Sequence, residues 1–202
     1  NGPDPDGTKQ ARATRIGQHM SWQILNEMDG WEEDMDKLLI SLPIAGTCFK
    51  KTYWDSAKQK NCSKLVLPKY LVVNYDTRCI EDAERVTEVI YISPRKVKER
   101  MNQGIFLDVE LGEPSGTDPL AYDRVNKAFQ IGSGDDKTTP YAFYEQHTFI
   151  DLDEDGYSEP YVVLVELASK EVLRIAPRFE VDGVVVGVNG EIASIEPIEY
   201  YT

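Results

Sequence analysis

The sequence predicts an α+β fold, in which a pair of N-terminal helices packs on a mainly antiparallel β-sheet with inserted short helices. The spacing of apolar residues changes from about 3.6 to about 2 near Gly46. β-Branched and aromatic residues then concentrate in short runs bounded by turn residues. With 202 residues, 41% of them hydrophobic, the chain can bury a core. We predict one domain over residues 1–202, with a helical segment at 1–43 and a β-rich portion at 44–202.

The first predicted helix runs from Thr8 to about Met28. Apolar residues recur every four positions along it, at Ile16, Met20 and Ile24, which gives a single stripe. The following Gly30 ends the helix.

A second helix is predicted from Trp31 to about Leu42, because apolar residues again follow the helical period. Acidic residues in its first turn suit the positive end of the helix dipole. Pro43 and Gly46 are expected to stop it. Leu39 lies on the apolar stripe and is expected to face the core.

Strands are predicted where apolar and polar residues alternate between turn signals. These segments are residues 47–54, 63–68, 70–75, 85–92, 141–152, 160–167, 171–180, 184–188 and 191–201. Two helices interrupt them, at 93–104 and 119–131. In the first, Ser93 is expected to cap the N-terminus and Gly104 to take the left-handed conformation at the C-terminus. Residues 132–139 are predicted to be an insertion rather than a domain boundary.

The charge of the chain disfavours tight binding of nucleic acid, since 35 acidic against 22 basic residues give a net charge of -13. No apolar run approaches the roughly 18 residues of a membrane span, and no signal-peptide pattern opens the chain. The three cysteines are odd in number and lack CxxC spacing, which argues against a disulfide framework and a zinc site. A reducing cytoplasm is the expected setting. The first residue is Asn1 rather than methionine, so we expect a piece of a longer protein.

An acidic segment, DLDEDGYSEPYV at residues 151–162, suggests a metal site. Asp151, Asp153 and Asp155 occupy positions 1, 3 and 5 of the EF-hand calcium loop. Tyr157 would offer a backbone carbonyl at position 7, and Glu159 stands at position 9. Alternate carboxylates on a tightly curved loop can converge on one hard cation.

Other features exclude a complete EF-hand. Val162 stands where the bidentate glutamate belongs, and Pro160 with the β-branched run behind it forbids the exiting helix. The first interpretation is therefore a β-hairpin that turns at Asp155 and Gly156. The second is the same hairpin holding calcium weakly; no other cofactor is predicted.

The remaining candidates for chemistry have simpler interpretations. His19 and His147 fit surface or hydrogen-bonded structural residues better than a catalytic base. Cys48 in a strand pattern fits a small hydrophobic residue better than a nucleophile. The basic cluster at residues 95–100 fits a solvated helix face better than a phosphate contact. An enzyme using Asp151 and Glu159 as paired carboxylates is disfavoured, since neither base nor nucleophile accompanies them.

Three runs of sequence resemble portal proteins of tailed bacteriophages, particularly short-tailed phages. They are WEEDMDKLLISLPIAGTCFKKTYWD, KLVLPKYLVVNYDTRCIEDAERVTEVIYISPRKVKERMNQG and YEQHTFIDLDEDGYSEPYVVLVE. The shared features are a helix feeding an Ile-Ala-Gly-Thr strand start, a Pro-x-x-Leu-Val-Val strand and a Tyr-Glu-x-His hairpin. The resemblance spans residues 31–175.

The resemblance implies a structural part rather than an enzyme. Portal proteins form rings of usually twelve copies at one capsid vertex, through which DNA is packaged and ejected. They meet capsid and scaffolding proteins. They also meet the terminase motor and tail adaptors, which is expected here to occur through parts outside this chain. The segment is similar to the outward-facing wing region. The expected location is the virion vertex, after assembly in the host cytoplasm, with no membrane partner.

Two functions therefore remain open: a portal wing fragment, or a small calcium-stabilised adaptor or binding domain unrelated to phage. For the isolated chain we expect a monomer or weak association, because ring closure would need the stem of a portal protein. We also expect negligible binding of duplex DNA at physiological salt, because the net charge repels phosphates.

Overall fold

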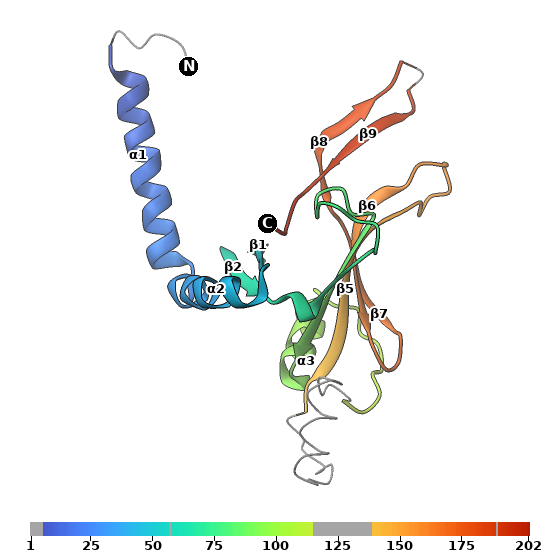
Figure 1. Ribbon diagram of the computed structural model, residues 1–202. Helices are drawn as coiled ribbons and strands as arrows, with labels where there is room; N and C mark the ends of the chain where they lie inside the picture. The colour runs from blue at the N-terminus through green and yellow to red at the C-terminus, as the bar shows by residue number, and fades with distance from the viewer. Residues whose placement is uncertain (1–5, 57, 115–138, 189) are drawn as a thin grey trace. The chain divides into compact units, whose positions relative to one another are not determined.

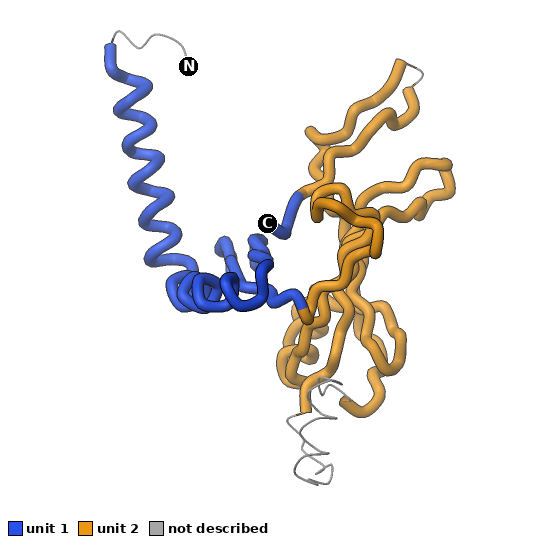
Figure 2. Tube along the Cα trace, viewed as in Figure 1, with its two compact units in different colours: residues 1–68, 199–202 blue, residues 69–198 orange. Residues whose placement is uncertain are grey.

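The computed structural model describes residues 6–56, 58–114, 139–188 and 190–202. It divides into two compact units, residues 1–68 with 199–202 and residues 69–198 (Figure 2). Both contain antiparallel strands, and the two helices come first in the chain, so the predicted α+β class is confirmed. The division falls at residue 68 and not at the change from helix to strand. That the chain is one domain stays a prediction, because two compact units can unfold together.

The first unit begins with helices α1 (Thr8–Trp22) and α2 (Trp31–Ala45). Between them, the π-helix η1 (Gln23–Glu27) continues α1, so the predicted first helix exists but changes its winding in its last turn. A two-stranded antiparallel hairpin follows, made of β1 (Phe49–Asp55) and β2 (Lys60–Val66) (Figure 1).

One side of α2 packs on this hairpin. Asp34 Oδ2 accepts a hydrogen bond from the Leu65 N–H at 3.1 Å. The Lys50 ammonium group lies 4.7 Å from the centre of the Trp31 ring and 3.0 Å from the Met35 sulfur. Desolvation of this ammonium lowers the pKa of Lys50, against the smaller raising effect of Asp34. The contacts fix α2 on the hairpin through its inner side.

The prediction that Pro43 ends the second helix is wrong, because α2 continues to Ala45. Pro43 lacks only its own N–H donor, and the Gly46 N–H still donates to the Leu42 carbonyl at 2.9 Å. The helix ends at Gly46, whose φ of 79° is left-handed.

The chain's last residues return to β1. The Lys50 N–H donates to the Thr202 carbonyl at 2.8 Å, and the Thr202 N–H donates to the Lys50 carbonyl at 2.9 Å. The Thr52 N–H donates to the Tyr200 carbonyl at 2.8 Å. Residues 199–202 therefore belong to the first unit although they end the chain.

The expectation that Leu39 faces the core is wrong, since 60% of this residue is exposed. Leu38, one position earlier and on the hairpin side, is half-buried. Adjacent helical residues lie about 100° apart, so the pair Leu38–Leu39 cannot both reach one neighbour. None of the residues in α1 or α2 is buried.

Leu39→Ala is therefore expected to change the free energy of unfolding by less than about 0.5 kcal/mol, because an exposed side chain loses little burial and Ala favours helix. Urea denaturation followed by circular dichroism measures this change. Leu38→Ala is the matched control and should cost more. A loss for Leu39→Ala in the range of about 2 to 5 kcal/mol, typical of a buried leucine, would contradict the exposure of this side chain.

The second unit contains a five-stranded antiparallel sheet, in the order β3-β4-β5-β6-β7. A short 3₁₀ turn, η2 (Pro68–Tyr70), precedes β3. The strands are β3 (Leu71–Val73), β4 (Arg85–Ile92), β5 (Tyr141–Ile150), β6 (Glu159–Glu166) and β7 (Val172–Pro177).

The core of this unit lies between the sheet and helix α3 (Pro94–Asn102). Phe143 and Leu173 are fully buried, and Val97 is the buried residue of the helix. Gly104 has the predicted left-handed conformation, with φ 71°. The prediction that the Ser93 side chain caps α3 is wrong: no side-chain cap bond forms, and its carbonyl accepts from the Val97 N–H instead.

A second small sheet of this unit pairs β8 (Phe179–Val186) with β9 (Ile192–Pro197). The strand predicted at 171–180 is therefore wrong as one element, because β7 ends at Pro177 and β8 starts in another sheet. Arg178 marks the break: its N–H donates to the Pro160 carbonyl at 2.9 Å, and its carbonyl accepts from the Ile198 N–H at 2.7 Å. The helix predicted at 119–131, and all but the last residue of the insertion predicted at 132–139, lie outside the described residues.

Candidate functional site

The acidic segment joins two paired strands. Ile150, the last residue of β5, lies opposite Glu159, the first residue of β6, and the two strands are antiparallel. Figure 1 shows β6 beginning at the end of this projecting loop. The predicted hairpin is thus confirmed, and residues 151–158 form its connection.

The three aspartates of the loop come together. Asp151, Asp153 and Asp155 each place a carboxylate oxygen within 4.8 Å of those of the other two. Two hydrogen bonds curve the loop: Asp151 Oδ2 accepts from the Gly156 N–H at 2.9 Å, and Asp155 Oδ1 accepts from the Tyr157 N–H at 2.7 Å. Such a spacing of oxygens is compatible with ligands of one hard cation.

The two carboxylate oxygens of Asp151 have different surroundings. Oδ1 is buried and has no hydrogen-bond partner within the described residues. A buried carboxylate oxygen normally has a donor or a cation beside it. Asp153 and Asp155 are exposed.

Tyr157 has a different role from the predicted one, in which only its backbone carbonyl mattered. Its side-chain hydroxyl accepts a hydrogen bond from the Ile195 N–H at 3.1 Å. Ile195 belongs to β9 and is buried. The hydroxyl therefore ties the acidic loop to the second sheet of this unit.

Tyr157→Phe is expected to lower the free energy of unfolding by about 1 to 3 kcal/mol, because the Ile195 N–H would lose its acceptor. Chemical denaturation measures this loss. Tyr75→Phe, a change at a fully exposed tyrosine, is the matched control and should have little effect. Equal stability of Tyr157→Phe and the wild type would show that water replaces the hydroxyl without loss.

Glu159 lies outside the group of close carboxylate oxygens, although the sequence predicts it as a fourth carboxylate ligand. It is only 6% exposed, and its Oε2 has no hydrogen-bond partner among the described residues. The nearby Tyr161 shows the local field: burial raises the pKa of its hydroxyl, and the charges of Glu159 and Asp153 raise it further. Both carboxylates therefore contribute negative potential at one tyrosine. Their binding of a metal stays a prediction.

Neither histidine belongs to the group of close carboxylate oxygens among the described residues. His147 is 1% exposed in the middle of β5, and its Nε2 lies 3.1 Å from Glu145 Oε1. His19 is exposed on α1 and its ring lies 6.1 Å from that of Trp22. Cys48 is half-buried and carries a free thiol.

The basic cluster of α3 is largely a solvated helix face, as predicted. Arg95 pairs with Glu99 on the same helix, and Lys98 Nζ lies 3.2 Å from Asp108 Oδ1. Arg100 departs from this interpretation, because its guanidinium group stacks 5.3 Å from the centre of the Phe106 ring. Arg95, Lys98 and Arg100 therefore have partners within the chain itself.

A shallow hollow of about 350 Å³ lies in the β8–β9 sheet. Its lining consists of Glu180, Asp182, Gly183, Glu196, Pro197 and Ile198. The lining contains no histidine, cysteine or lysine, so carboxylates are the only ionisable groups that it offers for chemistry.

No family model matches this chain, and no curated protein matches it. Among the helices described here, none is both long and apolar enough to cross a membrane.

Proposed function

We propose that the chain is a structural, non-enzymatic part of a bacteriophage portal ring, through which viral DNA is packaged and ejected. The support is the resemblance of residues 31–175 to portal wing regions, together with one structural feature. That feature is the large number of exposed apolar side chains on the two helices of the first unit.

These exposed side chains carry the proposal. On α2, Leu39, Ile40 and Ile44 are 60%, 67% and 82% exposed, while α1 exposes Ile16 and Met20 by 49% and 55%. Apolar surface of this extent on consecutive helices is typical of an interaction surface, because isolated chains rarely leave it in water. A subunit of a large assembly can bury such a surface against its neighbours.

The charge of the chain suits a passage for DNA rather than a binding site. A net charge of -13 repels phosphates and disfavours sites that would hold DNA in place. The other partners of this proposal are capsid and scaffolding proteins, terminase and tail adaptors, which would meet the full-length protein. The proposed location is the capsid vertex of the virion.

The full-length reading frame tests the proposal. We expect two long helices flanking a short α/β insert to be encoded downstream of Thr202, which would form the channel. Electron microscopy of the purified full-length protein should then show closed rings with a central channel. A reading frame without these helices, or a full-length protein that stays monomeric at high concentration, would overturn the portal proposal.

A second candidate function is a calcium-stabilised adaptor or binding domain. One observation favours it, namely the close carboxylate oxygens of Asp151, Asp153 and Asp155 beside the buried Asp151 Oδ1. Without a bidentate glutamate, affinity for calcium should be weak, on the order of 10⁻⁴ to 10⁻³ M.

Saturating calcium is expected to raise the unfolding temperature if the loop binds it, because a ligand of the folded state adds RT ln(1 + [L]/Kd) to stability. A titration to about 10 mM covers the expected range of affinity. Asp153→Asn should abolish the shift, and Asp76→Asn, at an exposed turn, should leave it unchanged. Magnesium and sodium chloride at matched ionic strength report general screening. Equal shifts with all three salts would eliminate the calcium site.

A further inference from the structure

The two helices of the first unit carry matching surface patterns. On α1, Lys9, Arg12, Ile16 and Met20 follow one another at spacings of three, four and four residues. On α2, Glu33, Asp36, Ile40 and Ile44 follow at the same spacings. Such spacings place each set on one face of its helix. We call them the basic face of α1 and the acidic face of α2, respectively.

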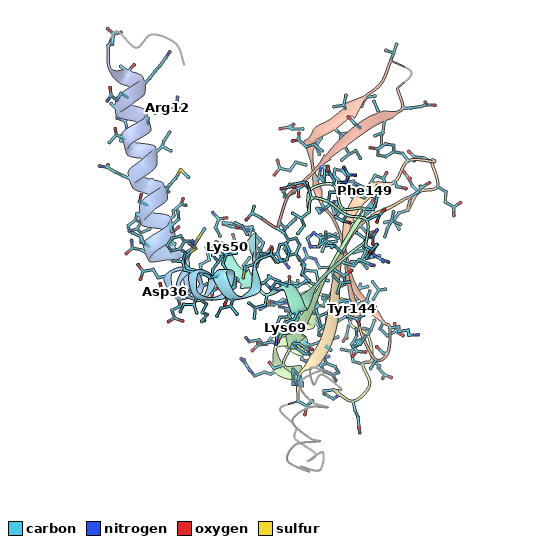
Figure 3. All side chains as sticks on the ribbon, viewed as in Figure 1. Arg12, Asp36, Lys50, Lys69, Tyr144 and Phe149 are labelled. Atoms are coloured by element: carbon cyan, nitrogen blue, oxygen red, sulfur yellow. The ribbon has the colours of Figure 1, made fainter. Side chains whose placement is uncertain are left out.

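Both faces are on the outside of the chain. All four residues of each are exposed. The acidic face of α2 lies opposite its inner side, where Asp34, Met35 and Trp31 contact the β1–β2 hairpin. Figure 3 labels Arg12 on α1 and Asp36 on α2. The face of α2 whose pattern matches α1 is thus the exposed one, turned away from the contacts with the hairpin that the described residues make.

The order of charged and apolar residues on the two faces favours one relative orientation of the helices. Each face begins with two charged residues and ends with two apolar ones, and the charges are opposite. If the helices lie parallel, Lys9 and Arg12 meet Glu33 and Asp36, and the apolar residues meet each other. If they lie antiparallel, every charged residue meets an apolar one. Charge and burial therefore both select the parallel arrangement.

Within one chain this parallel arrangement is impossible. The 15 residues of α1 are about 22 Å long, and η1 carries the chain further in the same direction. Only Met28, Asp29 and Gly30 separate η1 from α2, and three residues span at most about 11 Å. The chain cannot return to the start of α1 over that distance. A parallel match between the basic face and an acidic face therefore requires a second copy of the chain.

We propose that the basic face of α1 docks in parallel on the acidic face of α2 of a second copy of this chain. The contact joins different surfaces, so each copy offers one of each and successive copies connect head to tail, into a ring or an open chain. This inference rests on the proposed function in one respect: only that function makes the assembly a portal ring. The contact itself depends on the two faces alone.

A charge-swap experiment on the 202-residue chain tests the contact, with self-association measured by analytical ultracentrifugation over a range of protein concentrations. Arg12→Glu alone and Asp36→Arg alone should each weaken association about tenfold or more, because like charges then face each other. The chain carrying both substitutions should associate as the wild type does. Arg15→Glu, the same charge change on another side of α1, should have little effect.

Mixing shows that the contact joins two molecules. An equimolar mixture of Arg12→Glu chains and Asp36→Arg chains should associate more strongly than either variant alone, since opposite charges again face each other at every contact in the mixture. Higher salt should weaken wild-type association by screening. Circular dichroism confirms that the variants stay folded, as expected for exposed positions.

Three results would overturn the proposal. The first is a wild-type chain that stays monomeric at every protein concentration, the second is single variants that associate like the wild type, and the third is a double variant that associates no better than either single one. Binding of a labelled DNA duplex tests whether the basic face binds phosphate groups instead. If Arg12→Glu abolishes DNA binding but leaves self-association unchanged, the docking proposal is contradicted. A negative result of the charge-swap experiment does not contradict the portal proposal, which the reading frame tests separately. Conversely, a reading frame without stem helices leaves this contact standing.

Discussion

Phe143→Ala is expected to lower the free energy of unfolding of the second unit by about 3 to 5 kcal/mol, the largest loss for any truncation proposed here. Phe143 is 0% exposed in β5 and forms a cluster with Ile92, Leu164 and Leu173. Its ring also lies 6.5 Å from that of Phe106. The substitution therefore removes a ring that packs both on residues of the sheet and on the segment after α3.

Urea denaturation measures this loss when the β-strand signal is followed by far-ultraviolet circular dichroism. Tyr144→Ala is the matched control, because Tyr144 is the next residue of β5, points to the other side of the sheet by strand alternation and is 38% exposed. It should cost about 1 kcal/mol. Equal losses for the two variants would show that both faces of β5 are packed alike, against the burial seen here.

The strands of the second unit were predictable because their signal is local. Residues 85–92 alternate and were predicted with the bounds that β4 has in the structure. The break at Arg178 was missed, although Pro177 directly before it is a local signal against a continuous strand. What divides β7 from β8 is a pair of backbone hydrogen bonds to Pro160 and Ile198, and no local pattern encodes partners so far away.

The helices show a different limit of sequence reasoning. Periodicity placed both of them, but α2 carries apolar residues on two opposite sides, at Leu38 and at Ile40. Either side could face the hairpin from periodicity alone. The choice depends on contacts that only the fold supplies, such as the hydrogen bond from the Leu65 N–H to Asp34.

The candidate site was predicted in part. Spacing alone brings Asp151, Asp153 and Asp155 together, because alternate residues of a tight loop share one side. It could not predict that the Tyr157 hydroxyl reaches Ile195, 38 residues away, or that Glu159 is buried apart from the three aspartates. These features arise from packing between strands that are distant in the chain.

Val97→Asp is expected to destabilise the second unit by about 3 to 5 kcal/mol at pH 7, an effect as large as that of Phe143→Ala. Val97 is 3% exposed and is the buried residue of α3, in the cluster with Phe106 and Leu173. A carboxylate at this position would be buried among apolar side chains without a partner. Lys96→Asp, on the exposed side of the same helix, is the matched control and should change stability by less than about 0.5 kcal/mol.

The loss in Val97→Asp should depend on pH with a known sign. Burial disfavours the charged form, so the folded-state pKa of the new carboxyl group would lie above its unfolded value of about 3.9. The folded state then binds the proton more tightly, and stability relative to the wild type recovers as pH falls towards that value. Denaturation of both proteins at several pH values measures the difference. A loss that is the same at pH 7 and near pH 4 would show that residue 97 reaches solvent, and that α3 does not close this core.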